Sequence, residues 1–342
     1  MSSPQAPSTM RAMQISSSAG GIEKNLHINA SAPIPKRKPD QHLVEVIATA
    51  LNPVDYKPVE APLVTRYLLS KPHTPVIDYV GKIVQPADGS SLQPGQIVFG
   101  GASVHVLGGA LAEYTTSKKT SVAPLPEGLD PVWGATVCVA GLTAYQSISP
   151  CVKEGDSVFL NGGSGGTGVF GIQIAKAKGC HVTTTCSTPN VELCKSLGAD
   201  EVIDYKKSNV LQALIASGRK YDHVVDNVSG QPELYFKMHE YTRPGAVWVQ
   251  VGAKVTLTGL KQITSMMLLP GFLGGGKRKF QFFATDQKTE DLAQIGAWMK
   301  SGQVKPIIDS KFKFEDAPRA FERLKTDRAR GKIVVEVATE SS

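Results

Sequence analysis

Short apolar runs alternate with longer helical segments through the middle of the chain. Six runs of five to seven residues predict buried strands; they cover residues 157–161, 181–186, 201–205, 223–228, 246–252 and 280–284. Helical patterns at 169–178 and 191–197 separate the first three runs. Because this alternation is typical of a doubly wound parallel sheet, we expect an α/β domain with six parallel strands.

The first third of the chain has frequent prolines and little helical periodicity. Strands are predicted at 42–50 and 80–84, and a Pro-Gly turn leads into another within 93–99. These features predict a compact, barrel-like β domain. Residues 1–13 are polar and lack the apolar core of a signal peptide, so we expect them to form a disordered lead-in.

The pattern changes again after the sixth predicted strand. A helix is predicted at 292–300, a strand at 311–314, a helix at 317–325 and a final strand at 332–337. A six-stranded sheet has no place for these elements, so we expect them to return to the first domain. The predicted organisation is a substrate or catalytic domain at 1–132, a dinucleotide-binding domain at 133–285, and a returning segment at 286–342.

Composition narrows the class of protein. The 342 residues carry a net charge of +7, and basic clusters of three residues such as 277–279 are too short to indicate nucleic-acid binding. The five cysteines have no CxxC spacing, and their number is odd. This favours a reducing compartment over a disulfide framework, and we expect a cytoplasmic protein.

The segment 266–283, MMLLPGFLGGGKRKFQFF, joins apolar residues to three basic ones. No apolar run of the chain reaches the ~20 residues that a membrane span needs, and Pro270 and Gly271 interrupt the most apolar stretch, 266–273. Attachment to an anionic membrane surface is one interpretation. We favour a loop beside the last strand of the parallel sheet, which could also form a dimer contact. We expect a monomer or a homodimer.

A glycine-rich loop gives the strongest chemical signal. Residues 163–168 read Gly163, Ser164, Gly165, Gly166, Thr167 and Gly168, the pattern G-x-G-x-x-G. The loop follows a predicted strand and opens a predicted helix, as in dinucleotide-binding proteins. Gly163 would permit the tight turn, Gly165 would let the backbone approach a pyrophosphate, and Gly168 would let the helix pack against the strand. The alternative is an incidental glycine turn.

The end of the second strand favours NADP(H) over NAD(H). NAD sites usually carry a carboxylate about 20 residues after the glycine loop. Here the strand runs into Ser187, Thr188, Pro189 and Asn190, which would accept a 2′-phosphate rather than repel it. Few basic residues are available there to bind the 2′-phosphate, since no Lys or Arg occurs between Gly179 and Lys195. Tyr205 and Lys206, after the third strand, could contribute to binding. Alternatively, Ser187 is an ordinary loop residue.

Cysteine and histidine positions argue against a zinc site. The first 137 residues contain no cysteine, and His27, His42, His73 and His105 lack metal-ligand spacing. We therefore expect no bound metal. Without a Lewis acid, reduction of a simple ketone loses electrophilic assistance. A conjugated acceptor is easier to reduce, because attack at its β-carbon delocalises charge onto a distant carbonyl oxygen. Quinones, enones and enoyl thioesters are the expected substrates.

Several segments carry a resemblance to a known family. They are LNPVDYK at 51–57, AEY at 112–114, AGLTAYQ at 140–146, the glycine loop, KSLGADEVIDY at 195–205 and GKIVV at 331–335. In this order the chain resembles the zinc-free, quinone oxidoreductase-like branch of the medium-chain dehydrogenase/reductase superfamily over nearly its whole length. Within it, chloroplast-envelope quinone oxidoreductase homologues and fungal zinc-type alcohol dehydrogenase-like proteins are similar. The resemblance implies a GroES-like β-barrel-type catalytic domain and a Rossmann domain.

The resemblance also implies roles for individual residues. The cofactor-binding positions would be Asn52 and Thr143 near the nicotinamide, Gly163 to Gly168 at the pyrophosphate, Ser187 and Tyr205 at the 2′-phosphate, and Gly252 and Lys332 in the cofactor cleft. Two positions differ from relatives. Ile77, Asp78 and Tyr79 stand where zinc-binding relatives have Gly-His-Glu, and Asn190 stands where many relatives carry Lys or Arg.

Three residues are candidates for the catalytic proton transfer. Tyr56, Lys57 and Tyr67 lie in the segment that borders the substrate in the family. A tyrosine could protonate the developing enolate as a general acid. We favour Tyr67 over Tyr56, and a packing or rim role is the alternative for each.

The hypothesis is an NADPH-dependent oxidoreductase that transfers hydride to conjugated acceptors without metal. NADPH would bind between the two domains, and a side chain or water would supply the proton. A trans-acting enoyl reductase of a biosynthetic pathway is the first alternative, with the same fold and cofactor. A scaffold protein that binds NADPH without turnover is the second.

Overall fold

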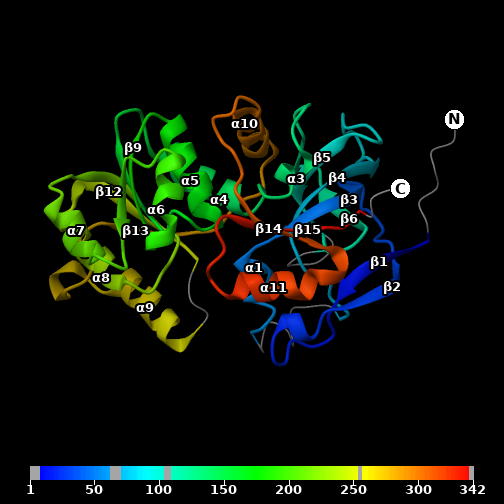
Figure 1. The fold of residues 1–342 in the computed structure, drawn as a ribbon, viewed down its shortest axis with the longest axis horizontal. Helices are drawn as coiled ribbons and strands as arrows, with labels where there is room; N and C mark the ends of the chain where they lie inside the picture. Colours follow the sequence, from blue (N-terminus) through cyan, green and yellow to red (C-terminus); the bar gives the residue numbers. More distant parts are fainter. Residues whose placement is uncertain (1–7, 62–70, 104–108, 253–255, 339–342) are drawn as a thin grey trace. The chain divides into compact units, whose positions relative to one another are not determined.

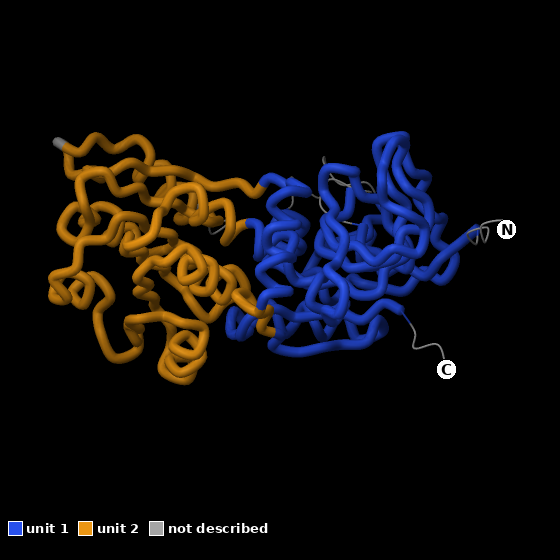
Figure 2. Tube along the Cα trace, turned by 90° about the horizontal axis from the view of Figure 1, so that it is seen from above, with its two compact units in different colours: residues 1–142, 286–301, 308–342 blue, residues 143–285, 302–307 orange. Residues whose placement is uncertain are grey.

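The computed structural model describes residues 8–61, 71–103, 109–252 and 256–338, which fold into two compact units (Figure 2). Unit 1 comprises residues 1–142, 286–301 and 308–342, and unit 2 comprises residues 143–285 and 302–307. The first crossing from unit 1 to unit 2 therefore follows residue 142, whereas the sequence analysis placed it after 132. The C-terminal elements belong to unit 1, apart from 302–307.

The sheet of unit 1 combines strands from the N-terminal and the C-terminal parts of the chain. Within the described residues its order is β14-β15-β3-β4-β5-β7, and β6 pairs with β3. Strand β3 pairs with β6 over residues 41–45 and with β15 over 48–51, while β4 runs antiparallel to it. The bounds are β3 (Gln41–Leu51), β4 (Asp78–Gln85), β5 (Ile97–Gly101), β6 (Tyr114–Lys118), β7 (Val122–Pro124), β14 (Ile308–Lys313) and β15 (Lys332–Glu336).

Short helices surround this sheet (Figure 1). They are η1 (Ile22–Lys24), α1 (Pro53–Tyr56), α3 (Pro131–Gly134), α10 (Thr289–Lys300), η6 (Phe314–Asp316) and α11 (Ala317–Lys325), and α4 (Ala140–Ile148) crosses into unit 2. The buried side of α11 packs into the core of unit 1 through Ala317, Ala320 and Phe321.

The N-terminal residues form a strand that the sequence analysis missed. Strand β1 (Thr9–Gln14) pairs antiparallel with β2 (His27–Pro33). Met10, Ala12 and Met13 are buried, with Thr9 exposed. The expectation of a disordered lead-in over residues 1–13 is therefore wrong for residues 9–13. Strand β1 has too few apolar positions to be recognised from the sequence. It is stabilised by pairing with β2 and by burial of its apolar side chains against neighbouring segments.

Unit 2 contains the predicted doubly wound sheet. Six parallel strands lie in the order β10-β9-β8-β11-β12-β13, so the strand order reverses between β8 and β11. The strands are β8 (Ser157–Asn161), β9 (His181–Cys186), β10 (Glu201–Asp204), β11 (Tyr221–Asp226), β12 (Thr242–Val251) and β13 (Lys279–Phe283). The predicted α/β class and six-stranded Rossmann sheet are confirmed.

The helices of unit 2 follow the strands in the expected alternation. They are η2 (Ser149–Cys151), α5 (Gly166–Ala177), η3 (Thr188–Asn190), α6 (Val191–Ser196), α7 (Val210–Ala216), α8 (Pro232–Phe236), η4 (Met238–Glu240), α9 (Leu257–Leu268) and η5 (Gly271–Leu273). Helices α7, α8 and α9 share one core cluster with β8, β11 and β12, centred on the rings of Phe159, Tyr221 and Tyr241. No described helix combines the length and the apolarity needed to cross a membrane.

Candidate cofactor and active site

The glycine loop joins β8 to α5 at the carboxyl edge of the parallel sheet. Gly162 has a φ of +90°, which only glycine adopts readily. The sequence analysis assigned the tight turn to Gly163, but the left-handed residue is Gly162. Gly163 has a different constraint, since an added Cβ would lie 2.3 Å from the Thr184 hydroxyl. At Gly168 a Cβ would lie 2.1 Å from the Gly162 carbonyl oxygen, so α5 packs against the loop as expected.

The N-terminus of α5 is accessible to a ligand. Gly165 is its N-cap residue, and no side chain caps the helix. A Cβ at Gly165 would meet only the Gly162 carbonyl oxygen, at 3.9 Å. Ser164, Gly166 and Thr167 beside it are only partly buried. The first-turn N–H groups have no partner within the helix, and the helix dipole favours an anion here. This cradle fits the pyrophosphate of a dinucleotide.

Ser187 and Asn190 lie next to the glycine loop. The Asn190 amide donates to the hydroxyl oxygens of Ser164 at 3.1 Å and Ser187 at 3.2 Å. Its own oxygen is buried and has no hydrogen-bond partner within the described part of the chain. A buried, unpaired acceptor is unfavourable, so it marks a place where a ligand donor would be stabilised. Asn190 thus connects the pyrophosphate loop with the residue expected at the 2′-phosphate.

A carboxylate stands near this position on the neighbouring strand. Asp204 ends β10 beside Cys186, accepts a hydrogen bond from the Thr188 hydroxyl at 2.6 Å and another from the Lys206 N–H at 3.0 Å. The Thr188 hydrogen bond lowers the pKa of this carboxyl. Tyr205 is exposed, and the Lys206 ammonium lies 5.5 Å from its ring centroid. Both charges therefore lie close to the expected 2′-phosphate position.

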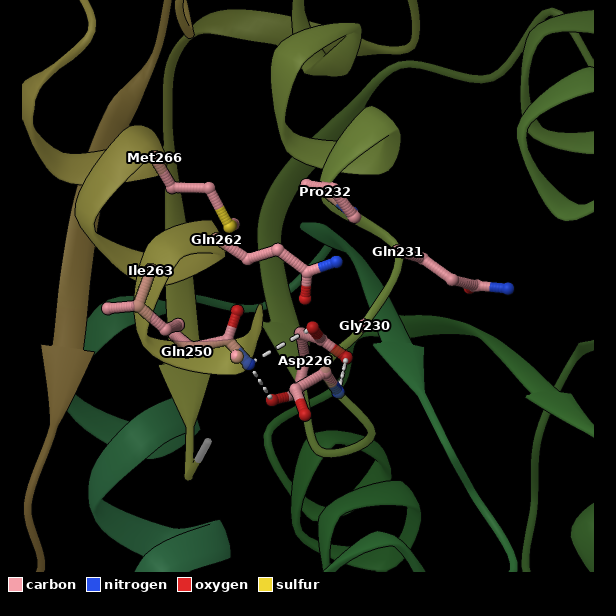
Figure 3. A pocket seen from close by; sticks show the side chains of 10 residues that line it. Asp226, Gly230, Gln231, Pro232, Gln250, Gln262, Ile263 and Met266 are labelled. Atoms are coloured by element: carbon pink, nitrogen blue, oxygen red, sulfur yellow. Dashed lines mark hydrogen bonds between the residues drawn. The ribbon is translucent and has the colours of Figure 1, made fainter. Parts of the chain in front are cut away.

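Four buried polar side chains cross the carboxyl edge of the sheet. The Thr185 hydroxyl donates to Asn161 Oδ1 at 2.6 Å, and Asn161 Nδ2 donates to Asp226 Oδ1 at 2.8 Å. Gln250 Nε2 donates to Asp226 Oδ2 at 3.1 Å (Figure 3). The Gly162 N–H donates to the Thr185 hydroxyl at 2.8 Å. A continuous network therefore runs from the glycine loop across the strand-order reversal to the end of β12.

Asp226 also holds the turn after β11. Its Oδ1 accepts the backbone N–H groups of Val228 at 3.0 Å and Ser229 at 3.2 Å. Ser229 has a φ of +60°, and Gly230 follows with +89°. Both oxygens of the Asp226 carboxylate thus accept hydrogen bonds from donors of the protein. This arrangement fixes the turn at the switch point, where ligands bind in open α/β sheets.

Thr143 and Gly252 also belong to unit 2. The Thr143 hydroxyl lies 2.6 Å from that of Thr285, and the Thr143 side chain is nearly buried. Gly252 directly follows β12, has a φ of +75°, and would place a Cβ in open space. Its carbonyl oxygen accepts from Gln250 at 3.3 Å. Gly252 therefore lies at the same sheet edge as the polar network.

Asn52 and Lys332 meet in a buried cluster of unit 1. The Lys332 ammonium donates to Asn52 Oδ1, to the Leu51 carbonyl oxygen at 3.1 Å, and to Asp78 Oδ2 at 3.2 Å. Asn52 Nδ2 in turn donates to Asp78 at 2.9 Å. Lys332 is 2 % exposed and Asp78 is fully buried. The side chain of Asn52 is therefore oriented by a buried ion pair.

A second carboxylate, Asp55, lies beside this cluster. It accepts the backbone N–H of Asn52 at 2.6 Å, which caps α1. Burial and then the neighbouring Asp78 raise the pKa of Asp55 to about 7. Burial also raises the pKa of Asp78, although Lys332 opposes the shift. One lysine faces two buried carboxylates, so the cluster favours the protonated form of Asp55 below neutral pH.

The proton-donor candidates have different environments. Tyr56 is buried in the core of unit 1, and the Lys325 ammonium lies 5.7 Å from its ring centroid. Burial raises the pKa of its hydroxyl. Lys57 is partly buried and follows α1 as its C-cap residue. Tyr67 lies outside the described residues, so its role stays a prediction.

Comparison with known proteins shows the family. Residues 38–127 match the alcohol dehydrogenase GroES-like domain, and residues 197–335 match the zinc-binding dehydrogenase domain. The chain is 45% identical to the trans-enoyl reductase pgmF of Aspergillus terreus, with 97% of each chain covered. It is 32% identical to the chloroplast envelope quinone oxidoreductase homolog of Arabidopsis thaliana, over 96% of this chain and 98% of that protein.

The chain belongs to the quinone oxidoreductase-like branch of the medium-chain dehydrogenase/reductase superfamily. This confirms the predicted family. A solved structure agrees: the quinone oxidoreductase from Coxiella burnetii superposes with a TM-score of 0.82 at 27% identity, covering 96% of this chain and 99% of that one. As a member of this superfamily the protein is an oxidoreductase that uses a nicotinamide cofactor.

One of the matched domains is described as zinc-binding, but the residues of this reductase do not form such a site where the structure describes them. No three His, Cys, Asp or Glu side chains within the described ranges are grouped so that they could hold a metal ion. His42 Nδ1 accepts the Ala87 N–H at 3.0 Å. His105 lies outside the described residues. At the position of the relatives' Gly-His-Glu motif, Asp78 is paired with Lys332.

Sequence reasoning missed the switch-point network of this reductase. Asn161, Asp226 and Gln250 each lie at or next to the end of an apolar run, and that position was the available signal. Polar residues at the carboxyl ends of buried parallel strands meet at one edge. The sequence alone did not show which strands are neighbours, and the network depends on the order β9-β8-β11-β12.

Proposed function

We propose that this protein is an NADPH-dependent reductase of conjugated acceptors, namely enoyl thioesters, enones and quinones. The observation that carries the substrate class is the 45% identity to a trans-enoyl reductase over 97% of both chains. Similarity to the 2-methylene-furan-3-one reductase of Solanum lycopersicum, 33% identical over 91% of this chain, supports it. The cofactor class rests on the open N-terminus of α5 at the switch point.

Each part of the cofactor has residues to hold it. The N-terminus of α5, from Gly165 to Thr167, would bind the pyrophosphate. Ser187 and Asn190 supply hydroxyl and amide groups for the 2′-phosphate, and Lys206 supplies a positive charge. The negative charge of Asp204 acts against that of Lys206. Asp204 already accepts two hydrogen bonds, from Thr188 and from the Lys206 N–H, which stabilise its carboxylate. Together, the hydroxyl and amide groups and the charge of Lys206 favour NADPH over NADH.

When bound, the nicotinamide supplies the hydride. The chain's part is to hold the reactants and to manage charge and protons. Thr143 and Gly252 are the proposed neighbours of the nicotinamide in unit 2, and the Asp226 network fixes the turn and strand end beside them. Asn52, held by Lys332 and Asp78, is the proposed contact from unit 1.

The proton for the enolate has three proposed sources. Tyr56 is protonated at neutral pH, as an ordinary tyrosine is, and burial raises its pKa further, so it has the protonation state of a general acid. Lys57 and Tyr67 are the other side-chain candidates, and solvent is the alternative to all three. Replacement of each by Phe or Met, with a solvent isotope effect on kcat, separates these sources.

The test follows NADPH oxidation at 340 nm by the purified protein. The acceptors are a quinone, a short enone, an enoyl thioester and a saturated ketone, each repeated with NADH. We expect oxidation with the conjugated acceptors only, and a higher kcat/KM with NADPH. Tight NADPH binding without oxidation by any acceptor would overturn the reductase proposal and favour the scaffold alternative.

A further inference from the structure

A partly buried triad of charged side chains packs against Tyr56. The Lys325 ammonium, at the end of α11, donates to Glu23 Oε2 and to Glu60 Oε1, both at 2.8 Å. The first carboxylate belongs to η1 and the second lies just beyond α1, so three segments that are distant in the sequence meet here within unit 1. We define the Lys325 clamp as Lys325, Glu23 and Glu60.

The backbone around the clamp supports this arrangement. Glu60 Oε1 also accepts the Ile22 N–H at 2.9 Å, at the start of η1. Gly21 has a φ of +113°, which favours glycine, and an added Cβ there would lie 2.3 Å from Glu23 Oε1. A side chain at Gly21 would therefore displace the Glu23 carboxylate that holds Lys325.

Lys325 and Glu23 stay charged although both are partly buried. Burial opposes the charge of Lys325, but hydrogen bonds to Glu23 and Glu60 raise the pKa of its ammonium above the usual value. Burial also opposes the charge of Glu23, and the hydrogen bond from Lys325 lowers the pKa of that carboxyl. The Glu23 side chain is 12% exposed, so solvent screens this pair less than an ordinary surface ion pair. The clamp therefore holds a positive charge in one place at neutral pH.

The clamp covers the ring of Tyr56. The Lys325 ammonium lies 5.7 Å from the ring centroid, within the range of a cation–π interaction. Tyr56 is 8% exposed and belongs to the same core cluster as Phe321 of α11. Its ring is thus packed against the core of unit 1 and also faces the ammonium of the clamp.

Charges of both signs act on the Tyr56 hydroxyl. Burial raises its pKa most, Asp327 and Glu60 raise it further, and Lys325 lowers it. Asp327 is exposed, lies after the end of α11 and has a φ of +54°, a conformation that Asn also adopts. Lys325 opposes these two carboxylates, so its removal would leave their negative charge uncompensated at the hydroxyl.

We propose that Lys325 is a positioning residue for proton transfer by Tyr56. Held by the two carboxylates of the clamp, its ammonium fixes the ring and keeps a positive charge close to it. This inference rests on the proposed role of Tyr56 as proton donor. In that step the O–H bond of Tyr56 breaks, a C–H bond forms at the α-carbon of the enolate, and a phenolate remains until water returns a proton. The positive charge of Lys325 stabilises this phenolate.

An ion pair that only stabilises the fold is the alternative, and α11 provides a comparison. Arg323 donates to Asp309 Oδ2 at 2.9 Å and to Asp309 Oδ1 at 2.7 Å. It is not among the charged groups of the described residues that act on the Tyr56 hydroxyl. Arg323→Met therefore removes a bidentate ion pair from the same helix without changing the charge next to Tyr56. It should lower stability, as Lys325→Met does, and leave proton transfer intact.

The test reads the acidity of the side chain at position 56 without relying on turnover. Difluorotyrosine, whose hydroxyl is more acidic than that of tyrosine, is incorporated in place of Tyr56 and titrated by fluorine NMR. The variants are Lys325→Met, Lys325→Arg, Asp327→Asn and Arg323→Met, each checked for folding by circular dichroism. In parallel, kcat and KM are measured with NADPH and a short enone across the pH range in which the protein stays folded, and also in Tyr56→Phe.

We expect Lys325→Met to move the fluorine titration to higher pH and Asp327→Asn to move it to lower pH, because one removes a cation and the other an anion. In Lys325→Met, kcat at neutral pH should fall about tenfold with KM within about twofold, since the loss is in proton transfer and not in binding. The alkaline limb of kcat should move to higher pH. Lys325→Arg should stay within about threefold of wild type, because a guanidinium also pairs with carboxylates and stacks on a ring.

An unchanged fluorine titration in Lys325→Met overturns the proposal, as do equal losses of kcat in Lys325→Met and Arg323→Met. If Lys325→Met does not fold, Lys325→Gln keeps a hydrogen-bond donor for the carboxylates, and the same upward shift is expected. If no acceptor is reduced, the reductase proposal falls, while a titration that moves with Lys325 still supports the clamp. In an active enzyme, wild-type kcat in Tyr56→Phe would overturn the role of Lys325 in proton transfer.

Discussion

Asn161 and Asp226 end two neighbouring parallel strands and are joined by a 2.8 Å hydrogen bond across the reversal of strand order. Because both side chains are buried, the bond links the strand that feeds the glycine loop to the strand that feeds the turn at Val228 and Ser229. Two backbone segments expected to border the cofactor are thus held by one carboxylate.

Replacing that carboxylate should weaken cofactor binding. In Asp226→Asn, the new NH2 group must face at least one of the donors Asn161, Val228 and Gln250. We expect a loss of about 1–3 kcal/mol in the free energy of unfolding and roughly a tenfold higher Kd for NADPH, measured by fluorescence titration. Asp222→Asn, at the other end of β11, is the control. It should lose stability without a change in Kd, and equal effects on Kd would contradict a positioning role.

Two glycines of the loop should respond differently to alanine. Gly168→Ala places a methyl group 2.1 Å from the Gly162 carbonyl oxygen, so we expect a stability loss of about 2 kcal/mol or more without cofactor. Gly165→Ala meets no close neighbour and should fold normally, yet its methyl group fills the pyrophosphate cradle. Thermal unfolding with and without NADPH separates them. A Gly165→Ala protein with unchanged NADPH stabilisation would place the pyrophosphate elsewhere.

The preference for NADPH should depend on two opposite charges. Asp204→Asn removes a negative charge near the expected 2′-phosphate, and Lys206→Ala removes a positive one. We expect the ratio of kcat/KM for NADPH over NADH to rise about two- to fivefold in the first and to fall similarly in the second. Lys195→Ala on α6 should leave the ratio unchanged. Identical ratios in all variants would exclude these groups from cofactor selection.

The stability that Asp55 contributes should decrease as the pH rises toward neutrality. The pKa of Asp55 is raised from an ordinary value of 3.8 to about 7, so the folded protein retains a proton that the unfolded chain releases between these values. The contribution of Asp55 to the free energy of unfolding should therefore fall by about 2–4 kcal/mol from pH 4 to pH 7 and then level off, seen as the difference between wild type and Asp55→Asn. Asp55→Asn should reduce this slope. Urea unfolding across the range measures it, and exposed Asp40→Asn should keep the wild-type slope.

Local patterns predicted the parallel sheet closely. Strands β8 and β9 have the predicted bounds, and α11 does as well, because their apolar spacing and flanking turns are intact within the sequence. The glycine loop was also readable, since a strand, a loop and a helix follow one another along the chain. Here local propensity and tertiary structure agree.

Other features depend on partners distant in the sequence. Strand β1 is stabilised by pairing with β2 and by burial of Met10 and Ala12, which no local pattern reveals. Lys332 was assigned by resemblance to the cofactor cleft, but its contact with Asp78 spans 254 residues and requires β15 to pair beside β3. Asp204 escaped notice because it lies on the third strand, beside the one that was inspected.

The position of β15 has a consequence for the order in which the chain can fold during synthesis. Strand β15 lies between β14 and β3, so the sheet of unit 1 is incomplete until residues 332–336 have left the ribosome. Nearly all of unit 2 is contiguous from 143 to 285 and is available earlier. Until that moment Asp78 has no lysine to neutralise it. The nascent chain therefore contains nearly all of the nucleotide-binding unit before the sheet of unit 1 can be completed.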